Sequence, residues 1–420
     1  MADVEIMARV GVGGGAPVER LVCHPRLPFV AGLSSARPMV HVWGCEGGEL
    51  RELGTVGGDA ADYDDVVGWE RITRTPGVAW HPDEPLLLVA SEGTVTRWTP
   101  AGISALDGLP PAAAYRRLAF SPDGRTLWAM PSASDAEDDD NDWGASDTID
   151  LGTGKVAPAR WWDTGIAAHP GGGLVLTYRS DQGATLGLFA RVTQDGAMRT
   201  LRRALILDVD GYEEPIFSRD GRHFAIRGNA YDQTLEVFNF PSLERVLGTI
   251  LGDPNPGYPY PDEWVEQMRA WSRHNTAFGA EPGVLWIGTP DGELLRLDVT
   301  DQEADQHDVL AGSPVTALAA MATGELVVAS GGGELVLVSV PAGAAAPRDA
   351  AALRALVTTF VDSTSDVPDD DEDLEEHLVV TDGTRTWEMS DWESVLSAED
   401  TDPTWLQLQA AINNARDQEK

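Results

Sequence analysis

Three histidines occupy equivalent positions, each directly before a proline at the end of an apolar run: His24, His81 and His169. Imidazole is the commonest metal ligand in proteins, so their repetition raises the question of a metal site. Ser121 and Ser218 stand at the same place in two other segments. Since the position accepts serine, and since no histidine has a zinc-binding spacing with cysteine, we expect these side chains to stabilise turns. We predict no catalytic residue, no metal site and no cofactor.

The acidic run from Asp138 to Gly144 places oxygen donors at alternate positions, as the start of a calcium-binding loop does. An EF-hand loop has glycine at its sixth position and glutamate at its twelfth. Counted from Asp138, Gly144 is seventh and Ile149 is twelfth. We therefore interpret the run as a solvated acidic loop whose calcium binding, if any, is weak.

Charge and composition exclude several classes of protein. The 420-residue chain has a formal net charge of -38, which repels nucleic acid and anionic membranes. Cys23 and Cys45 fall outside any CxxC spacing, which indicates a reducing compartment. The N-terminal residues lack the basic start and apolar run of a signal peptide, so we expect a cytoplasmic location. Lysine occurs only at Lys155 and Lys420 among 30 basic residues, which indicates a bacterial genome rich in GC.

The histidine and serine turns belong to a repeated unit. Over residues 78–98 the unit reads as a short strand, a Pro/Asp turn, a strand apolar on both faces, a glycine turn and a third strand. Variants of this unit begin near residues 21, 118, 166, 216, 276 and 315. Repeated short strands with tight turns predict an all-β fold, a β-propeller of seven blades, with eight as the alternative.

At Ala119 to Gly124 the chain reads Ala-Phe-Ser-Pro-Asp-Gly, and the third strands of two units end in Trp43 and Trp98. In these features it resembles the WD-repeat propellers over about residues 18–340. The resemblance implies a propeller that acts as a platform, or scaffold, for protein–protein interaction.

The two ends of the chain carry separate predictions. We expect residues 1–345 to form the propeller, with a strand over residues 5–10 completing the seventh blade and hiding its edge. Residues 346–420 form an acidic C-terminal extension, or an eighth blade with an acidic insertion at residues 369–373. Within them we expect a strand over residues 356–360 and a hairpin over residues 378–387. A terminal amphipathic helix over residues 404–416 should present Trp405, Leu408 and Ile412 on one face.

Three long insertions, over residues 54–75, 131–146 and 252–273, fall in loops that emerge on one face of a propeller. The third should contain a short helix with Asp262 as its N-cap and with Trp264, Met268 and Trp271 on one face. This helix either packs down as a cap or presents a partner-binding patch. The candidate anchors for a protein partner are the aromatic residues of the insertions: Tyr63, Trp69, Trp143, Tyr258, Tyr260, Trp264 and Trp271.

The acidic residues beside these aromatics, Asp62, Asp64, Asp65 and residues 138–142, favour a partner with a basic surface. The rival function is a propeller enzyme, such as a metal-dependent lactonase or hydrolase with its site at the central channel. Such a site needs several oxygen donors at the ends of the first strands. Those ends read His-Pro, Ser-Pro or Gly-Ala, so the sequence favours the platform.

Overall fold

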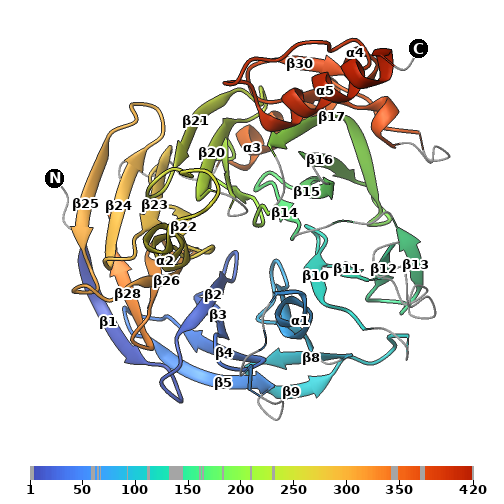
Figure 1. The fold of residues 1–420 in the computed structure, drawn as a ribbon. Helices are drawn as coiled ribbons and strands as arrows, with labels where there is room; N and C mark the ends of the chain where they lie inside the picture. The colour runs from blue at the N-terminus through green and yellow to red at the C-terminus, as the bar shows by residue number, and fades with distance from the viewer. Residues whose placement is uncertain are drawn as a thin grey trace. The chain divides into compact units, whose positions relative to one another are not determined.

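The computed structural model describes residues 4–57, 62–63, 66, 68–91, 93–110, 114–131, 145–159, 162, 165–181, 184–208, 211–228, 232–341, 349–368 and 374–418, without the side chains of 68, 69 and 181. The chain divides into two compact units. Unit 1 comprises residues 1–161 and 251–347, and unit 2 comprises residues 162–250 and 348–420. The strands form seven small sheets, so the fold is a seven-bladed β-propeller, as predicted (Figure 1).

The described residues of unit 1 form five four-stranded antiparallel blades and two short helices. The blades are β2 (Val18–Cys23), β3 (Phe29–Ser34), β4 (Met39–Gly44) and β5 (Arg51–Gly57); β6 (Gly77–Trp80), β7 (Leu87–Ser91), β8 (Thr94–Thr99) and β9 (Gly102–Ala105); β10 (Arg117–Phe120), β11 (Thr126–Met130), β12 (Ser146–Asp150) and β13 (Val156–Ala159); β22 (Thr276–Phe278), β23 (Val284–Gly288), β24 (Glu293–Asp298) and β25 (Ala304–Asp308); and β26 (Val315–Ala320), β27 (Leu326–Ser330), β28 (Glu334–Ser339) and β1 (Glu5–Gly11). The helices are α1 (Gly68–Arg74) and α2 (Asp262–Ala270).

Unit 2 holds the fourth and fifth blades and the C-terminal segment. The blades are β14 (Ala167–Ala168), β15 (Leu174–Asp181), β16 (Ala184–Val192) and β17 (Met198–Asp208); and β18 (Ile216–Phe217), β19 (His223–Arg227), β20 (Thr234–Asn239) and β21 (Arg245–Ile250). The C-terminal segment contains α3 (Ala350–Asp362), the 3-10 helix η2 (Leu374–His377), β29 (Val379–Thr381), β30 (Thr386–Glu388), α4 (Met389–Trp392) and α5 (Thr404–Gln418).

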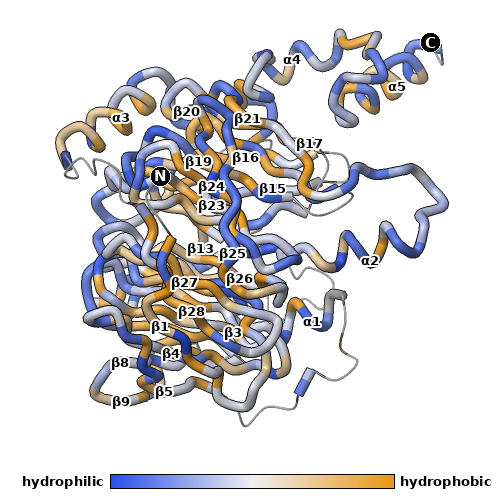
Figure 2. The backbone as a smooth tube through the Cα atoms, turned by 90° about the vertical axis from the view of Figure 1, so that its left-hand side faces the viewer, coloured by the Kyte–Doolittle hydropathy of each residue, from blue (hydrophilic) through white to orange (hydrophobic). Residues whose placement is uncertain are grey.

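The second strands of the blades are buried on both faces. Every residue of β11, β23 and β27 is buried. A strand packed against a neighbouring sheet on each side loses the polar alternation of a half-exposed strand, which is why these segments read as continuous apolar runs. Figure 2 shows the same apolar stretches along the strands. The predicted pattern of burial is therefore confirmed.

The seventh blade is completed by the N-terminus, as predicted. Strand β1 pairs antiparallel with β28, in the sheet order β1-β28-β27-β26. Arg9 adds a hydrogen bond of 2.6 Å from its Nη2 to the carbonyl oxygen of Val309. The strand thus covers the β28 edge, which would otherwise offer unpaired backbone groups to another chain.

The C-terminal segment corrects one prediction and confirms another. Residues 356–360, expected as a strand, lie in helix α3, whose buried residues Leu353, Val357 and Phe360 recur at helical spacing. Asp349 caps this helix by accepting from the amides of Ala351 and Ala352, and three alanines fill the first turn. The expected hairpin is present as β29 and β30, but it extends blade four into a six-stranded sheet.

Helix α5 also exists as predicted, but it buries a different face. Trp405, Leu406, Ala410 and Asn413 are buried, while Leu408 and Ile412 are 45% and 49% exposed. Hydrogen bonds from Asn413 account for this orientation of the helix. Asn413 Nδ2 donates to the carbonyl oxygens of Trp392 and Val395, so the side of the helix that carries Asn413 faces inward. Among the described residues, the helices are all too short or too polar to cross a membrane.

Candidate functional site

The first insertion folds around Tyr63. Tyr63 is 5% exposed, and its ring lies under the Arg71 guanidinium, with Cζ 3.3 Å from the ring centroid. Arg71 also binds Glu19 at 2.6 Å, so Tyr63 and Arg71 tie α1 to β2. Burial raises the pKa of the Tyr63 hydroxyl. Tyr63, a predicted partner anchor, therefore presents little of its ring to solvent.

The third insertion contains helix α2, which stands free of the core. None of its residues is buried. Its N-cap is Pro261 in an extended conformation, not Asp262 as predicted, and no side chain accepts from the first amides. Asp262 instead lies in the first helical turn, where its charge suits the positive end of the helix dipole. The face predicted for this helix, Trp264, Met268 and Trp271, is half-buried at all three positions, so it lies partly against the protein and partly open to solvent.

Three aromatic residues form a ridge before and within α2: Tyr258 and Tyr260, which are exposed, and Trp264, which is half-buried. Tyr258 is 89% exposed and Tyr260 is 39% exposed. The ring centroids of Tyr258 and Tyr260 are 6.0 Å apart, and those of Tyr260 and Trp264 are 5.1 Å apart. Trp264 Nε1 donates to the carbonyl oxygen of Asp253 at 3.1 Å, which fixes the indole in place. We call these three residues the aromatic ridge.

Acidic residues lie near the ridge in the sequence of the same segment. Asp253, Asp262, Glu263 and Glu266 are exposed within the same segment, against two exposed arginines, Arg269 and Arg273. Clustered exposed carboxylates create a negative local potential that attracts cations and basic surfaces. The ridge thus combines large apolar contact area with a charge preference.

One end of the α2 segment is hydrogen-bonded to β26, and the two ends of the segment lie against each other. Ser272 donates to the carbonyl oxygen of Thr316 at 2.6 Å. At the other end, Gly252 (φ +80°) lies so close to Trp271 that an added Cβ would come within 2.7 Å of its Nε1. Trp271 is half-buried, and its contact with Gly252 brings the two ends of the segment together. The middle of the segment stays exposed while its ends are held.

Figures 1 and 2 place α1 and α2 on the same side of the unit 1 strands. The side chain of Trp69 lies outside the described residues, as do Trp143, Asp64, Asp65 and the run 138–142. For these residues, and for calcium, the sequence-based expectations stay predictions.

The first-strand histidines act in turns, as expected. His24 Nδ1 accepts from the amides of Arg26 and Leu27, both at 3.0 Å, and His81 Nδ1 accepts from Asp83 and Glu84. His169 Nδ1 accepts from the amide of Gly171 at 2.9 Å. We call these three side chains the turn histidines.

The far side of each imidazole ring reaches the next blade. Since Nδ1 accepts, the proton lies on Nε2. His24 Nε2 then donates to Glu84 at 2.8 Å, and His169 Nε2 donates to Gly221 at 3.0 Å, in each case to the carbonyl oxygen. Burial lowers the pKa of His169 to about 4, because the desolvated ring resists protonation.

Ser121 and Ser218 stabilise the equivalent turns through hydrogen bonds within the turn itself. Ser121 Oγ donates to Asp123 at 2.6 Å and accepts from the amide of Thr126. Ser218 Oγ donates to Asp220 at 2.7 Å and accepts from the amide of His223. Within the part of the chain that the structure describes, no cluster of three or more His, Cys, Asp or Glu side chains is arranged to hold a metal ion.

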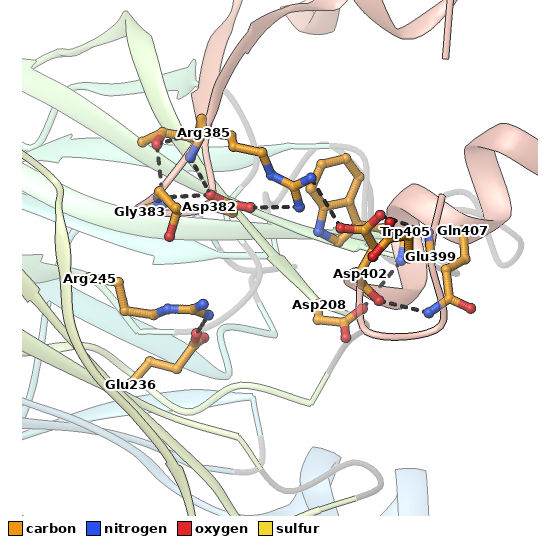
Figure 3. A network of polar contacts seen from close by, with 12 residues as sticks. Asp208, Glu236, Arg245, Asp382, Gly383, Arg385, Glu399, Asp402, Trp405 and Gln407 are labelled. Carbon is orange, nitrogen blue, oxygen red and sulfur yellow. Dashed lines mark hydrogen bonds and ion pairs between the residues drawn. The ribbon is translucent and has the colours of Figure 1, made fainter. Parts of the chain in front are cut away.

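A polar network in unit 2 was not anticipated from the sequence (Figure 3). Asp382 accepts from the amides of Thr384 and Arg385, and Arg385 reaches Asp402 at 3.1 Å. Arg245 donates its amide to Gly383 at 3.0 Å and its guanidinium to Glu236 at 2.8 Å. These contacts bind the β29–β30 hairpin to blade five and to the turn before α5.

Three tryptophans support the same hairpin. Trp405 lies edge-on to Trp387 at 5.1 Å and stacks on Trp392 at 5.5 Å. Trp405 is buried together with Val380 and Leu378. The spacing of the three tryptophans within the last part of the chain is the signal that sequence reasoning could have used to find this cluster.

No protein-family model matches the chain, and a search of curated proteins found no match either.

Proposed function

We propose that this protein is a divergent WD-repeat-like propeller that serves as a protein–protein interaction platform in the bacterial cytoplasm. Its binding surface is the face with the long insertions, and its partner presents a basic surface. The observation that carries the proposal is the aromatic ridge, in which Tyr258 and Tyr260 are exposed and Trp264 is half-buried, on a segment that Ser272 holds to β26. Aromatic side chains supply large contact area with few rotatable bonds and are enriched among binding hot spots.

Electrostatics supports a basic partner. The exposed carboxylates around the ridge attract positive charge and raise the rate of encounter. Since the Debye length is about 8 Å at physiological ionic strength, this attraction weakens as salt is added. Capture of the partner is therefore expected to be more efficient in low salt.

The rival function, a metal-dependent hydrolase with its site at the channel, finds less support. Such a site requires free oxygen and nitrogen donors at the ends of the first strands. In five of the blades those ends carry the turn histidines, Ser121 and Ser218, whose polar atoms bind backbone groups or turn aspartates. These groups already have partners and are poorly placed to ligate a cation.

The test is affinity capture from the source organism with four full-length chains, two of them ridge variants. These are the native protein, Tyr258→Ala and Trp264→Ala in the ridge, and Ile103→Ala as a matched control. Ile103 is 54% exposed in β9, so its truncation removes apolar surface without touching the ridge. Loss of a hot-spot residue costs at least about 2 kcal/mol, so the ridge variants should retain at least about tenfold less partner.

The ridge variants should also keep the native melting curve, because none of the three ridge residues is fully buried. Equal retention by the ridge variants and the native protein would contradict the proposal. A lower melting temperature of Trp264→Ala with undiminished binding would show that α2 is part of the fold and not of the binding surface.

A further inference from the structure

A pocket of about 450 Å³ opens in unit 2 between β17, the β29–β30 hairpin and the turn that follows α3. Its size falls within the range of small-molecule sites. The side chains that matter for its chemistry are Arg203 on β17, Ser363 and Thr364 after α3, Thr386 on β30, and Asp362. The platform function makes no use of this pocket.

Arg203 is held in the pocket wall by protein groups on two sides. Its Nη1 donates to Ser363 Oγ at 3.2 Å, and its Nη2 donates to the carbonyl oxygen of Ser242. The guanidinium also lies over the Phe360 ring, 5.2 Å from the centroid. Cation–π contact and two anchoring bonds orient the group before any ligand arrives.

The anchoring bonds leave most of the donor capacity of Arg203 unused. A guanidinium carries five N–H donors, and the described protein groups accept from two of them. Arg203 is half-buried, and this burial lowers the pKa of its guanidinium. A half-buried, oriented guanidinium is the group that proteins use for bidentate recognition of phosphate and carboxylate.

The rest of the wall suits an oxyanion that is part of a larger polar molecule. The hydroxyls of Thr364 and Thr386 make no hydrogen bond with the described residues. Two of the last carbonyls of α3 are occupied, because Phe360 and Val361 accept from Ser363 and Thr364. Asp362 is the one acidic residue of the described lining, and it can accept from a ligand hydroxyl.

We propose that this pocket binds the phosphate group of a small phosphate monoester. Arg203 pairs with the phosphate oxygens, Thr364 and Thr386 donate to them, and Asp362 accepts from a hydroxyl of the esterified part. The net charge of -38 repels anions in general. Non-specific binding of phosphate to the rest of the protein should therefore be weak, and binding at a specific site should be distinguishable from it.

The test is calorimetric titration of the full chain with inorganic phosphate, with chloride at equal ionic strength as the reference. Saturation at one site with phosphate, but not with chloride, is expected. Arg203→Gln should weaken binding at least about tenfold, since a charge-assisted bidentate contact is among the stronger hydrogen bonds. Arg222→Gln, which removes an exposed arginine of the same unit outside the pocket, should bind phosphate like the native protein.

Since Arg203 also anchors Ser363 and Ser242, its substitution can loosen α3. Thr386→Val removes only an exposed hydroxyl from the wall and keeps the shape of the side chain, so it provides the second variant. Weaker phosphate binding by folded Thr386→Val supports the site. Phosphate binding no tighter than chloride binding, or undiminished in both folded variants, overturns the proposal.

Glycerol 3-phosphate then separates an ester from the free ion. Tighter binding than inorganic phosphate, with the difference lost in Asp362→Asn, supports the monoester. Equal or weaker binding overturns that assignment.

Discussion

The two ends of the chain each add a strand to a blade, but different forces hold them there. Strand β1 pairs antiparallel with β28 at six positions, and its residues are exposed or half-buried. Strand β29 pairs parallel with β17 at only three positions, but Val380 is fully buried at its centre. The N-terminal addition depends on backbone pairing, and the C-terminal addition depends on side-chain packing.

This difference shows how a short strand can be stable at a sheet edge. Parallel pairing is slightly weaker per residue than antiparallel pairing, and three pairs alone would not order a segment. The tryptophan cluster behind β29 buries enough apolar surface to compensate. Strand β1 needs no such cluster because it completes a regular ladder that is already in place.

The largest effect is expected from Trp405→Ala. The side chain is 4% exposed between two other tryptophans, and removal of a buried indole costs about 3–5 kcal/mol. The C-terminal segment should lose hydrogen-exchange protection and become sensitive to protease after residue 348. Trp405→Phe keeps a ring in the site and should cost much less.

Leu408→Ala is the matched control for Trp405→Ala, because Leu408 lies in the same helix and is 45% exposed. It should change the free energy of unfolding by less than about 0.5 kcal/mol. Similar losses for Trp405→Ala and Leu408→Ala would contradict the view that packing holds the C-terminal segment.

A smaller stability loss, but a larger loss of solubility, is expected when residues 1–11 are deleted. The deletion removes few buried side chains, so the free energy of unfolding should fall by about 1–3 kcal/mol. The uncovered β28 edge should promote association, visible by light scattering on warming. Deletion of residues 1–3 alone leaves β1 complete and provides the control. A shortened chain as soluble and stable as the native one would refute the closure of blade seven by β1.

The smallest change in stability is expected from removing one ion pair at each end of the chain. Arg191 binds both carboxylate oxygens of Asp366 in the C-terminal segment, whereas Arg9 and Glu334 are 3.6 Å apart beside β1. Asp366→Asn should therefore destabilise by about 1 kcal/mol or less, and Glu334→Gln by nearly nothing. Chemical denaturation of both variants gives the two values.

The pH dependence of the Asp366 contribution follows from its pKa. The hydrogen bond from Arg191 lowers the pKa of the Asp366 carboxyl from its ordinary value of 3.8. Its contribution is therefore complete above that value and is lost as the pH falls through the lower pKa of the folded state. Between native protein and Asp366→Asn, the difference should persist at neutral pH and disappear in strong acid. A difference that grows on acidification would contradict the ion pair.

The blades were predictable because their signals are local. Each repeat places a Pro/Asp or glycine turn beside a doubly apolar strand, and these signals need no knowledge of distant residues. The strand predicted at residues 356–360 was wrong because Val357, Thr358 and Thr359 favour β-structure locally. The N-cap at Asp349 and the alanines after it favour a helix, and the segment is helical in the structure.

Features that depend on contacts outside the repeat could not be predicted from the sequence, for a physical reason. The parallel pairing of β29 with β17 joins segments far apart in the chain, and the burial of Asn413 rather than Leu408 depends on contacts with the preceding turn at Trp392 and Val395. The exposed state of Tyr258 and the buried state of Tyr63 likewise follow from what packs on each ring, and the two residues look alike as sequence. Composition predicted which segments hold aromatics but not which of them face solvent.

The turn histidines limit how the blades of this propeller can be exchanged in protein engineering. Gly221 and Gly124 have φ values of +66° and +72°, and a methyl group added to either would collide with the imidazole of His169 or His81 from the preceding blade. A turn is therefore matched to the turn before it in the chain. Blade shuffling or grafting that ignores this match would bring a side chain against a ring or leave a donor unpaired. The smallest exchangeable part of this propeller is a junction between two blades, and not a blade.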